Sequence, residues 1–509
     1  MARQGRRGHR KPRGSGGFKQ PPWRRVSNPY KPIEVLREEQ VEQIHEASLN
    51  VLENLGLEFL SDEALSILDA AGAEVDHAGK RVRFDRGLIM ESIKHAPAEF
   101  TLHARNPKRN VTVGGNNISF SPVGSPPNCS DLDNGRRMGT YVDYCNLLRI
   151  GHSLNIIHLI SGYPVEPVDL PPATRHLDAC YGYITLTDRA WHPYSLGKER
   201  IMDGIEMLCI ARGIDHQQLA REPSLVSVIN TNSPLRVDGP MLEGTMAMAR
   251  HGQPPIVTPF TLSGAMAPIT LAGALAQQNA EALAVIALIQ IINPGCPVVY
   301  GGFTSNVDMK TGAPAFGTPE YSKAALAGGQ LARRYNLPYR SSNVNAANLV
   351  DAQAAYESEM SIWAAVMGHA NIVMHGAGWL EGGLCASFEK MIIDAEMLQM
   401  MAAFLKPLEV SDATLALDAI EDVGPGGHFF GTAHTLERYE TAFYEPIVSD
   451  WCNFENWEES GAETATMRAN GIWKQILAEY EPPPLDQDKD EALKDFIARR
   501  KRDGGALAA

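Results

Sequence analysis

Short apolar segments alternate with longer helical segments from about residue 115 onward, and this alternation limits the fold more than any other feature of the chain. Eight segments have the length and composition of strands: 118–121, 156–161, 192–196, 225–229, 256–260, 297–300, 338–342 and 371–374. The helical stretches between them, for example 238–250, 267–292, 319–335 and 352–367, are long enough for right-handed crossovers between parallel strands. The pattern predicts an α/β fold, a (β/α)8 TIM barrel.

A doubly wound open sheet is the alternative that fits a similar pattern. In that fold a GxGxxG turn usually follows the first strand and binds a nucleotide. No such turn follows residues 118–121, so the barrel is favoured.

The segments outside the alternation divide the rest of the chain. The predicted parts are a disordered basic tail (1–30), an N-terminal helical and hairpin cap (31–114), the barrel (115–408), a C-terminal extension packing on the barrel (409–480) and a charged tail (481–509). The tail at the start is expected to be disordered because its first 25 residues hold nine Lys or Arg, no acid and no apolar run. The last part is mostly charged, so little order is expected there beyond a turn or two of helix.

Composition excludes several classes of function. The net charge is −14, and because residues 1–25 carry nine positive charges and no acid, the rest of the chain carries −23; so acidic a body argues against nucleic-acid binding. No apolar stretch reaches the length of about 18 residues that would suggest a membrane span. The seven cysteines are odd in number and lack any CxxC pair, which favours reduced thiols and a cytoplasmic location. No HxH, HExxH or Cys/His cluster is present, so no metal site is predicted.

The segment 337–357 carries the most specific information about function. It runs from Leu337-Pro338 to Asp351-Ala352-Gln353-Ala354, where a predicted helix opens. In order and spacing it resembles the trimethylamine:corrinoid methyltransferase family, whose trimethylamine enzymes carry pyrrolysine within this loop. Val344 occupies that position, so the chain is similar to the pyrrolysine-lacking members that act as glycine betaine:corrinoid methyltransferases.

Other motifs match the same family in order. They include Ser263-Gly264, Gln278-Asn279-Ala280-Glu281, Gly317-Thr318-Pro319-Glu320, Gly376-Ala377-Gly378 and Phe388-Glu389, and weaker similarity covers most of residues 30–480. The resemblance implies a methyltransferase that moves a methyl group from a small quaternary amine, glycine betaine or an analogue, to Co(I). The Asp-x-His-x-x-Gly pattern of corrinoid-binding proteins is missing, so the resemblance implies a separate corrinoid protein that docks over the barrel mouth. It also implies a homo-oligomer.

Other functions remain open at this point. The same barrel could demethylate proline betaine, carnitine, choline or trimethylamine, and a non-catalytic binder of quaternary amines would need the same pocket.

Aromatic residues at the predicted strand ends are the candidates for binding the substrate cation. Rings of this kind attract a quaternary ammonium by about 0.5 to 2 kcal/mol each. The candidates are Phe260, Tyr300, Phe303 and Trp379.

Arg340 and His375, on adjacent predicted strands, are the candidates for binding a substrate carboxylate. Arg340 could instead point outward and pair with an acid, because side chains alternate along a strand.

Three further positions are candidates for the catalytic centre. Asn343 and Val344 follow the seventh predicted strand, although Val344 cannot itself act as a catalyst. Glu281 matches a family position, and a surface salt bridge is the alternative for an acid inside a long helix.

Overall fold

A seven-stranded sheet forms the centre of the structure, a computed structural model that describes residues 18–160 and 162–506. The strand order is β1 (Val26–Ser27), β7 (Asn117–Pro122), β18 (Ile372–Ala377), β17 (Tyr339–Ser342), β14 (Val299–Gly301), β12 (Pro255–Val257) and β10 (Ser227–Ile229). All neighbours are parallel except β1 and β7. With its covering helices the chain has a mixed α/β fold.

Backbone pairing continues past β10 toward the opposite edge of the sheet. Trp191 forms a parallel bridge with Leu225 and another with Ile160. The N–H of His158 donates to the carbonyl oxygen of Phe120 in β7 at 2.8 Å. The predicted strands 156–161 and 192–196 are therefore replaced by single bridges. Pro193 has no N–H to donate, which explains the interruption of the second of them.

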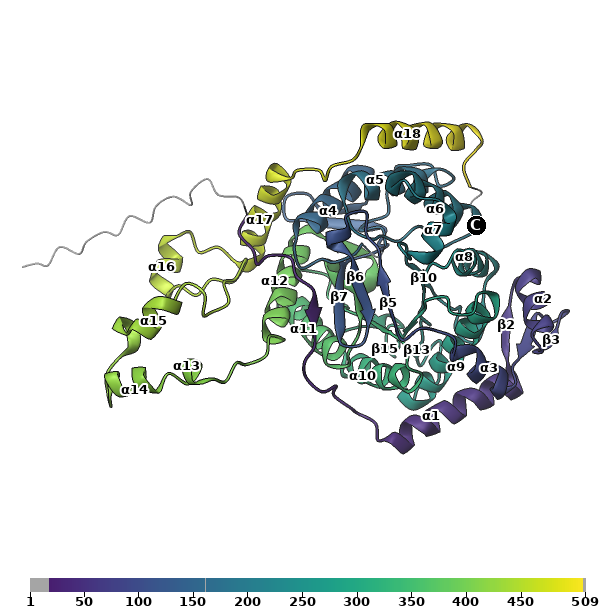
Figure 1. Cartoon of the computed structure of the whole chain (residues 1–509), viewed down its shortest axis with the longest axis horizontal. Helices are drawn as coiled ribbons and strands as arrows, with labels where there is room; N and C mark the ends of the chain where they lie inside the picture. Colours follow the sequence, from purple (N-terminus) through teal and green to yellow (C-terminus); the bar gives the residue numbers. More distant parts are fainter. Residues whose placement is uncertain (1–17, 161, 507–509) are drawn as a thin grey trace, which may run out of the picture.

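Helices connect the strands and surround the sheet (Figure 1). They are α4 (Tyr141–Ser153), α5 (Arg175–Leu186), α6 (Lys198–Arg212), α7 (His216–Arg221), α8 (Gly239–Arg250), α9 (Leu271–Ile292), α10 (Pro319–Arg334), α11 (Ala352–Met367) and α12 (Phe388–Phe404). The predicted helix 352–367 has the observed bounds of α11, because the Asp351 side chain accepts hydrogen bonds from the N–H groups of Gln353 and Ala354 at its start.

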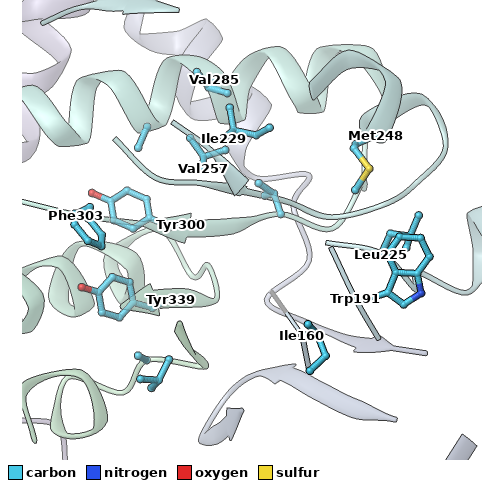
Figure 2. Packing of buried hydrophobic residues seen from close by; sticks show 14 of the residues in the cluster. Ile160, Trp191, Leu225, Ile229, Met248, Val257, Val285, Tyr300, Phe303 and Tyr339 are labelled. Atoms are coloured by element: carbon cyan, nitrogen blue, oxygen red, sulfur yellow. The ribbon is translucent and has the colours of Figure 1, made fainter. Parts of the chain in front are cut away.

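The core lies between the strands and these helices (Figure 2). Ile229 and Val257 of the sheet pack near Val285 of α9, and all three are fully buried. Among the described residues α9 is the one helix whose length and composition would suit a membrane, which the sequence-based expectation overlooked. Since 78% of its apolar window is buried in the protein, α9 is a core helix.

The first strand of the N-terminal part, β1, lies on the central sheet. Residues 1–17 lie outside the described residues, but β1 pairs with β7 and Val26 is buried, so the predicted disorder does not extend to residue 30. The cap contains α1 (Glu38–Asn50), η1 (Val51–Leu55), α2 (Asp62–Ala70), α3 (Arg86–Ile93), a sheet of β2 (Leu57–Phe59), β3 (Glu74–Asp76), β4 (Arg81–Arg83) and β11 (Arg236–Val237), and a hairpin of β5 (Glu99–Leu102) and β6 (Val111–Gly114). Helices α1 and α3 pack on α9.

The C-terminal part divides into an arm and two packed helices. The arm, residues 408–463, carries α13 (Asp412–Leu415), α14 (Leu417–Val423), η4 (Phe429–Gly431), α15 (Ala433–Arg438) and α16 (Phe454–Glu459), and it extends away from the sheet (Figure 1). Helix α17 (Ala465–Glu479) packs on α12. The charged end is not disordered as predicted: α18 (Gln487–Arg502) packs on α6, where Arg500 pairs with Asp203 at 2.7 Å.

Candidate active site

A cavity of about 590 Å³ opens at the carboxyl ends of the central strands. Five of the sequence-predicted site residues line it: Phe260, Phe303, Arg340, His375 and Trp379. They come from segments that are distant in sequence and that the parallel strands bring to one edge.

The apolar wall of the cavity is a cluster of aromatic rings centred on Phe303. Its ring centroid lies 5.3 Å from Phe260, 5.3 Å from Phe316 and 6.2 Å from Trp379. Phe316 was missed from the sequence because it follows the small hairpin β15 (Ser305–Val307) and β16 (Pro314–Ala315) rather than a main strand. The rings form a packed apolar surface beside the open space, which suits a methylated cation.

Arg340 places a buried cation against this wall. Its side chain is 1% exposed, and its guanidinium carbon lies 5.2 Å from the centroid of the Phe303 ring. Within the described part of the chain, Nε and Nη1 have no hydrogen-bond partner. Burial lowers the pKa of Arg340 to about 10, so it stays charged at neutral pH. The outward alternative is wrong, and an unpaired buried cation of this kind indicates a site for an anionic group.

His375 lies beside Arg340 in an unusual backbone conformation. Its φ is +54°, and its ring centroid is 4.2 Å from that of Trp379. Burial, and then the charge of Arg340, hold the pKa of His375 well below its usual value. His375 is therefore neutral near pH 7 and can offer one N–H, not the positive charge that the sequence allowed. Its Nδ1 and the Trp379 Nε1 also lack partners among the described atoms.

Two predicted residues lie behind the cavity wall. Tyr300 is fully buried and its hydroxyl donates to Asn279 of α9 at 2.9 Å. It points to the helix side because side chains alternate along β14. Glu281 is also buried, so the surface salt bridge is wrong. It accepts hydrogen bonds from Ser233 at 2.7 Å and from the N–H of Leu235 at 2.8 Å, and thereby holds that loop.

The loop after β17 is fixed from outside the cavity. Val344 is fully buried and its carbonyl accepts a hydrogen bond from Ser361 at 2.8 Å. The Asn343 amide donates to the carbonyl of Gly376 at 3.0 Å. Glu357 accepts the N–H groups of Ala346 and Ala347 at 2.8 and 3.0 Å. Neither Asn343 nor Val344 lines the cavity, so the loop acts as structure behind the wall.

Polar residues that sequence reasoning missed line the other side of the cavity. His192 accepts the N–H of Val228 through Nε2 at 2.8 Å, and burial lowers its pKa to about 4. Glu166 and Arg175 form an ion pair at 2.7 Å. These side chains lie in or after the two segments that form only single bridges, where the sequence had suggested no candidate site residue. The position of His192 at the start of a predicted strand was the available signal.

A buried ion pair supports the Trp379 turn. Lys390 and Asp394 of α12 are paired with both side chains at 0% exposure. The other oxygen of Asp394 accepts the N–H of Gly378 at 2.9 Å, and Lys390 donates to Ser358 at 2.7 Å. The pair therefore ties the turn after β18 to α11 and α12.

Gly383 sets the position of the Trp379 indole. A Cβ at this residue would lie 2.6 Å from two indole carbons, and the backbone has a φ of +101°. We expect Gly383→Ala to displace Trp379 and to weaken ligand binding about tenfold, as measured by calorimetry. Gly312→Ala is the matched control, because its φ is +76° but a Cβ would meet no atom within 4 Å. Equal effects of the two changes would attribute the loss to backbone strain instead.

Metal-ligating side chains do not gather at this site. Across residues 18–160 and 162–506, no group of three His, Cys, Asp or Glu side chains could hold a metal ion.

Comparison with known proteins identifies the family. The family described as "Trimethylamine methyltransferase (MTTB)" matches residues 2–505. This chain belongs to the trimethylamine methyltransferase family. It is 41% identical over 472 residues to the glycine betaine methyltransferase of Desulfitobacterium hafniense strain Y51, covering 92% of this chain and 98% of that protein. It is 30% identical over 470 residues to a trimethylamine methyltransferase of D. hafniense strain DSM 10664, covering 92% and 94%.

Among solved structures, this family member is similar to the Methanosarcina barkeri monomethylamine methyltransferase. The TM-score is 0.48 with 11% identity, and the match covers 94% of this chain and 90% of that one.

Proposed function

We propose that this enzyme transfers a methyl group from a small carboxylated quaternary amine, such as glycine betaine, to Co(I) of a separate corrinoid protein. The observation that carries the proposal is the cavity in which the unpaired guanidinium of Arg340 lies beside aromatic rings. A betaine has the complementary charges, a carboxylate and a methylated cation. The 41% identity to a glycine betaine methyltransferase supports the same choice.

We also propose that the sheet is a (β/α)8 barrel. Eight segments support this proposal: β7, the segments at Ile160 and Trp191, β10, β12, β14, β17 and β18. Each lies beside the next one in chain order, and β18 pairs with β7 again. In such a barrel the carboxyl ends of the strands carry the site. The cavity lies at that edge.

The substrate carboxylate is assigned to Arg340. A guanidinium donates N–H groups to a carboxylate, and Nε and Nη1 of Arg340 are buried atoms without partners among the described residues. Neutral His375 and the Trp379 indole add N–H donors to the same cavity. This pairing would give the buried guanidinium a counter-charge.

The trimethylammonium group is assigned to the aromatic wall of Phe260, Phe303 and Trp379. The ring faces attract and orient the cation, which has neither an N–H to donate nor a lone pair to accept a hydrogen bond. When the methyl carbon bonds to Co(I), the C–N bond breaks and nitrogen keeps the electron pair as a neutral tertiary amine. No proton is needed, so this chain's residues have to bind, orient and exclude water.

The loop position of Val344 agrees with a quaternary donor. A neutral tertiary amine gives up a methyl group poorly unless the enzyme activates it. The buried, apolar side chain of Val344 cannot supply that activation. The corrinoid acceptor, the homo-oligomer and the cytoplasmic location stay predictions.

The test uses the purified enzyme with glycine betaine, proline betaine, carnitine, choline and trimethylamine. We expect saturable binding of a carboxylated quaternary amine by calorimetry and methylation of free cob(I)alamin, followed by absorbance, with that amine alone. Activity confined to trimethylamine would overturn the proposal. Binding without any methyl transfer would favour a non-catalytic binder.

The aromatic wall gives a further prediction. Phe303→Leu and Trp379→Leu keep much of the apolar volume but remove the ring faces, so we expect each to weaken betaine binding by about 0.5 to 2 kcal/mol. Tyr300→Phe is the control, because Tyr300 lies behind the wall and should leave affinity unchanged. Calorimetry measures all three, and unchanged affinity in both Leu variants would remove the rings from the cation site.

A further inference from the structure

A second cavity, of about 390 Å³, lies where the arm leaves the end of α12 (Figure 1). Its walls come from the segment before β1, the last two turns of α12 and residues 441–445 of the arm. Among the described residues, none lines both this cavity and the active-site cavity. The two cavities are therefore separate sites on the molecule.

Gln399 of α12 is the buried polar residue of the second cavity. It is 4% exposed, and within residues 18–160 and 162–506 neither its amide oxygen nor its amide nitrogen has a hydrogen-bond partner. A buried amide costs free energy unless it is hydrogen-bonded. An amide left open at both atoms indicates a ligand that supplies an acceptor and a donor side by side.

Two basic side chains make the lining positive. Arg24 donates to the carbonyl oxygen of Ala402 in the last turn of α12, and burial lowers the pKa of Arg24. Lys406 follows the helix and is exposed. In the part of the chain that the structure describes, neither cation forms an ion pair with an acid. Glu445, the acid in the lining, is exposed, so the lining favours an anion.

The spacing of these groups sets the length of the ligand. Gln399 and Lys406 are two turns apart on one face of the helix, and Arg24 reaches the carbonyl of Ala402 between them. An anion held by both cations would therefore lie roughly 5 to 10 Å from the amide. Phe443, which is 85% exposed, and Tyr444 add aromatic rings to the lining, and such rings suit a planar group.

Hydrogen bonds fix the walls of the cavity. Glu396, one turn before Gln399, accepts the Tyr444 hydroxyl at 2.6 Å and the N–H of Ile447 at 2.7 Å, so the arm is tied to α12. On the opposite wall, the Gln20 side chain accepts the N–H of Asn155 at 2.8 Å. A cavity with fixed walls binds a small ligand at a low cost in ordering.

We propose that the second cavity binds a small organic anion with the chemistry of a nucleoside monophosphate. The phosphate lies between Arg24 and Lys406, and adjacent donor and acceptor atoms of the base pair with the Gln399 amide. A volume of about 390 Å³ has room for one such molecule. A phosphate ion alone would leave the amide without partners, and a nucleoside alone would leave both cations unpaired. This site is independent of the proposed methyl transfer.

Calorimetry of the purified enzyme with AMP, UMP, adenosine and inorganic phosphate tests the proposal. We expect saturable binding of at least one of the two nucleotides, with adenosine and phosphate at least tenfold weaker. Gln399→Leu and Lys406→Met should each weaken nucleotide binding about tenfold. Lys323→Met is the matched control, because Lys323 is an exposed lysine of α10 outside the cavity, and it should leave the affinity unchanged.

The melting temperature of Gln399→Leu checks that the variant folds. Since the change removes an amide without partners, the melting temperature should stay the same or rise. A lower one would show that the amide is already satisfied in the protein, which removes the main support for a ligand.

Three binding results would overturn the proposal. The first is the absence of binding by both nucleotides. The second is inorganic phosphate that binds as tightly as the nucleotides, since the amide would then recognise nothing. The third is nucleotide affinity that Arg340→Met lowers and that Gln399→Leu and Lys406→Met leave unchanged, which would place the nucleotide in the active-site cavity.

Discussion

Glycine betaine binding is expected to weaken about hundredfold when Arg340 is replaced by methionine, because a buried charge pair contributes about 3 kcal/mol. The guanidinium has two nitrogens without partners and no acid within ion-pair distance among the described residues, so the substrate carboxylate would be its counter-ion. Methionine keeps the length and apolar stem of the side chain and removes only the charge and its donors. Calorimetry with the wild type and the variant measures the difference.

Choline is the matched control ligand, since it carries the same trimethylammonium group without a carboxylate. Its affinity should change little in Arg340→Met. Arg340→Lys should recover only part of the betaine affinity, because an ammonium cannot make the paired contact of a guanidinium. Equal losses for betaine and choline would mean that Arg340 shapes the cavity and does not recognise the carboxylate.

Stability is expected to move in the opposite direction from affinity. Without ligand, Arg340 is a desolvated cation whose cost is offset by contact with Phe303 rather than by an acid. Removing that charge should leave the melting temperature unchanged or raise it. A buried charge that costs stability and contributes affinity is typical of a binding function.

The sequence predicted the elements where hydrophobic periodicity and helix caps agreed. Helix α11 begins at the capping Asp351, and six of the eight predicted strands appear within a few residues of their expected bounds. The strand prediction failed at the segments around Ile160 and Trp191. Proline and polar residues interrupt the backbone pairing there, although each segment still lies beside its neighbours. The charged segment from residue 487 on forms a packed helix because Asp203 supplies a partner that lies far away in sequence.

Within the site, sequence identified the strand ends but not the direction of each side chain. Arg340 points into the cavity and its neighbour Tyr339 points to α10, where its hydroxyl donates to Ala325. A shift of one residue along the strand would exchange them. Phe316, which packs against Phe303, and His192, which lines the cavity, were missed because a hairpin and an irregular segment position them, and neither arrangement follows from local pattern.

Asp394→Leu is expected to destabilise the fold by about 3 to 5 kcal/mol, because it leaves Lys390 as an unpaired charge at a fully buried position. Burial already lowers the pKa of Lys390. The folded protein therefore binds a proton there less readily than the unfolded chain, so stability rises with pH. The loss should accordingly be larger at about pH 6 than at about pH 9. Denaturant unfolding at the two pH values measures it.

The double variant Lys390→Met/Asp394→Leu separates charge from packing. Since an apolar pair of similar volume can replace a buried ion pair, the double variant should recover most of the lost stability. It would still lack the acceptor for the Gly378 N–H, so the Trp379 turn should stay loosened and betaine affinity should stay low. Glu91→Ala removes an exposed ion pair with Lys94 and should leave unfolding unchanged. If the double variant is as unstable as Asp394→Leu, the loss comes from the missing contact between the Gly378 N–H and Asp394. In that case the main role of Asp394 is to hold the turn, not to balance the charge of Lys390.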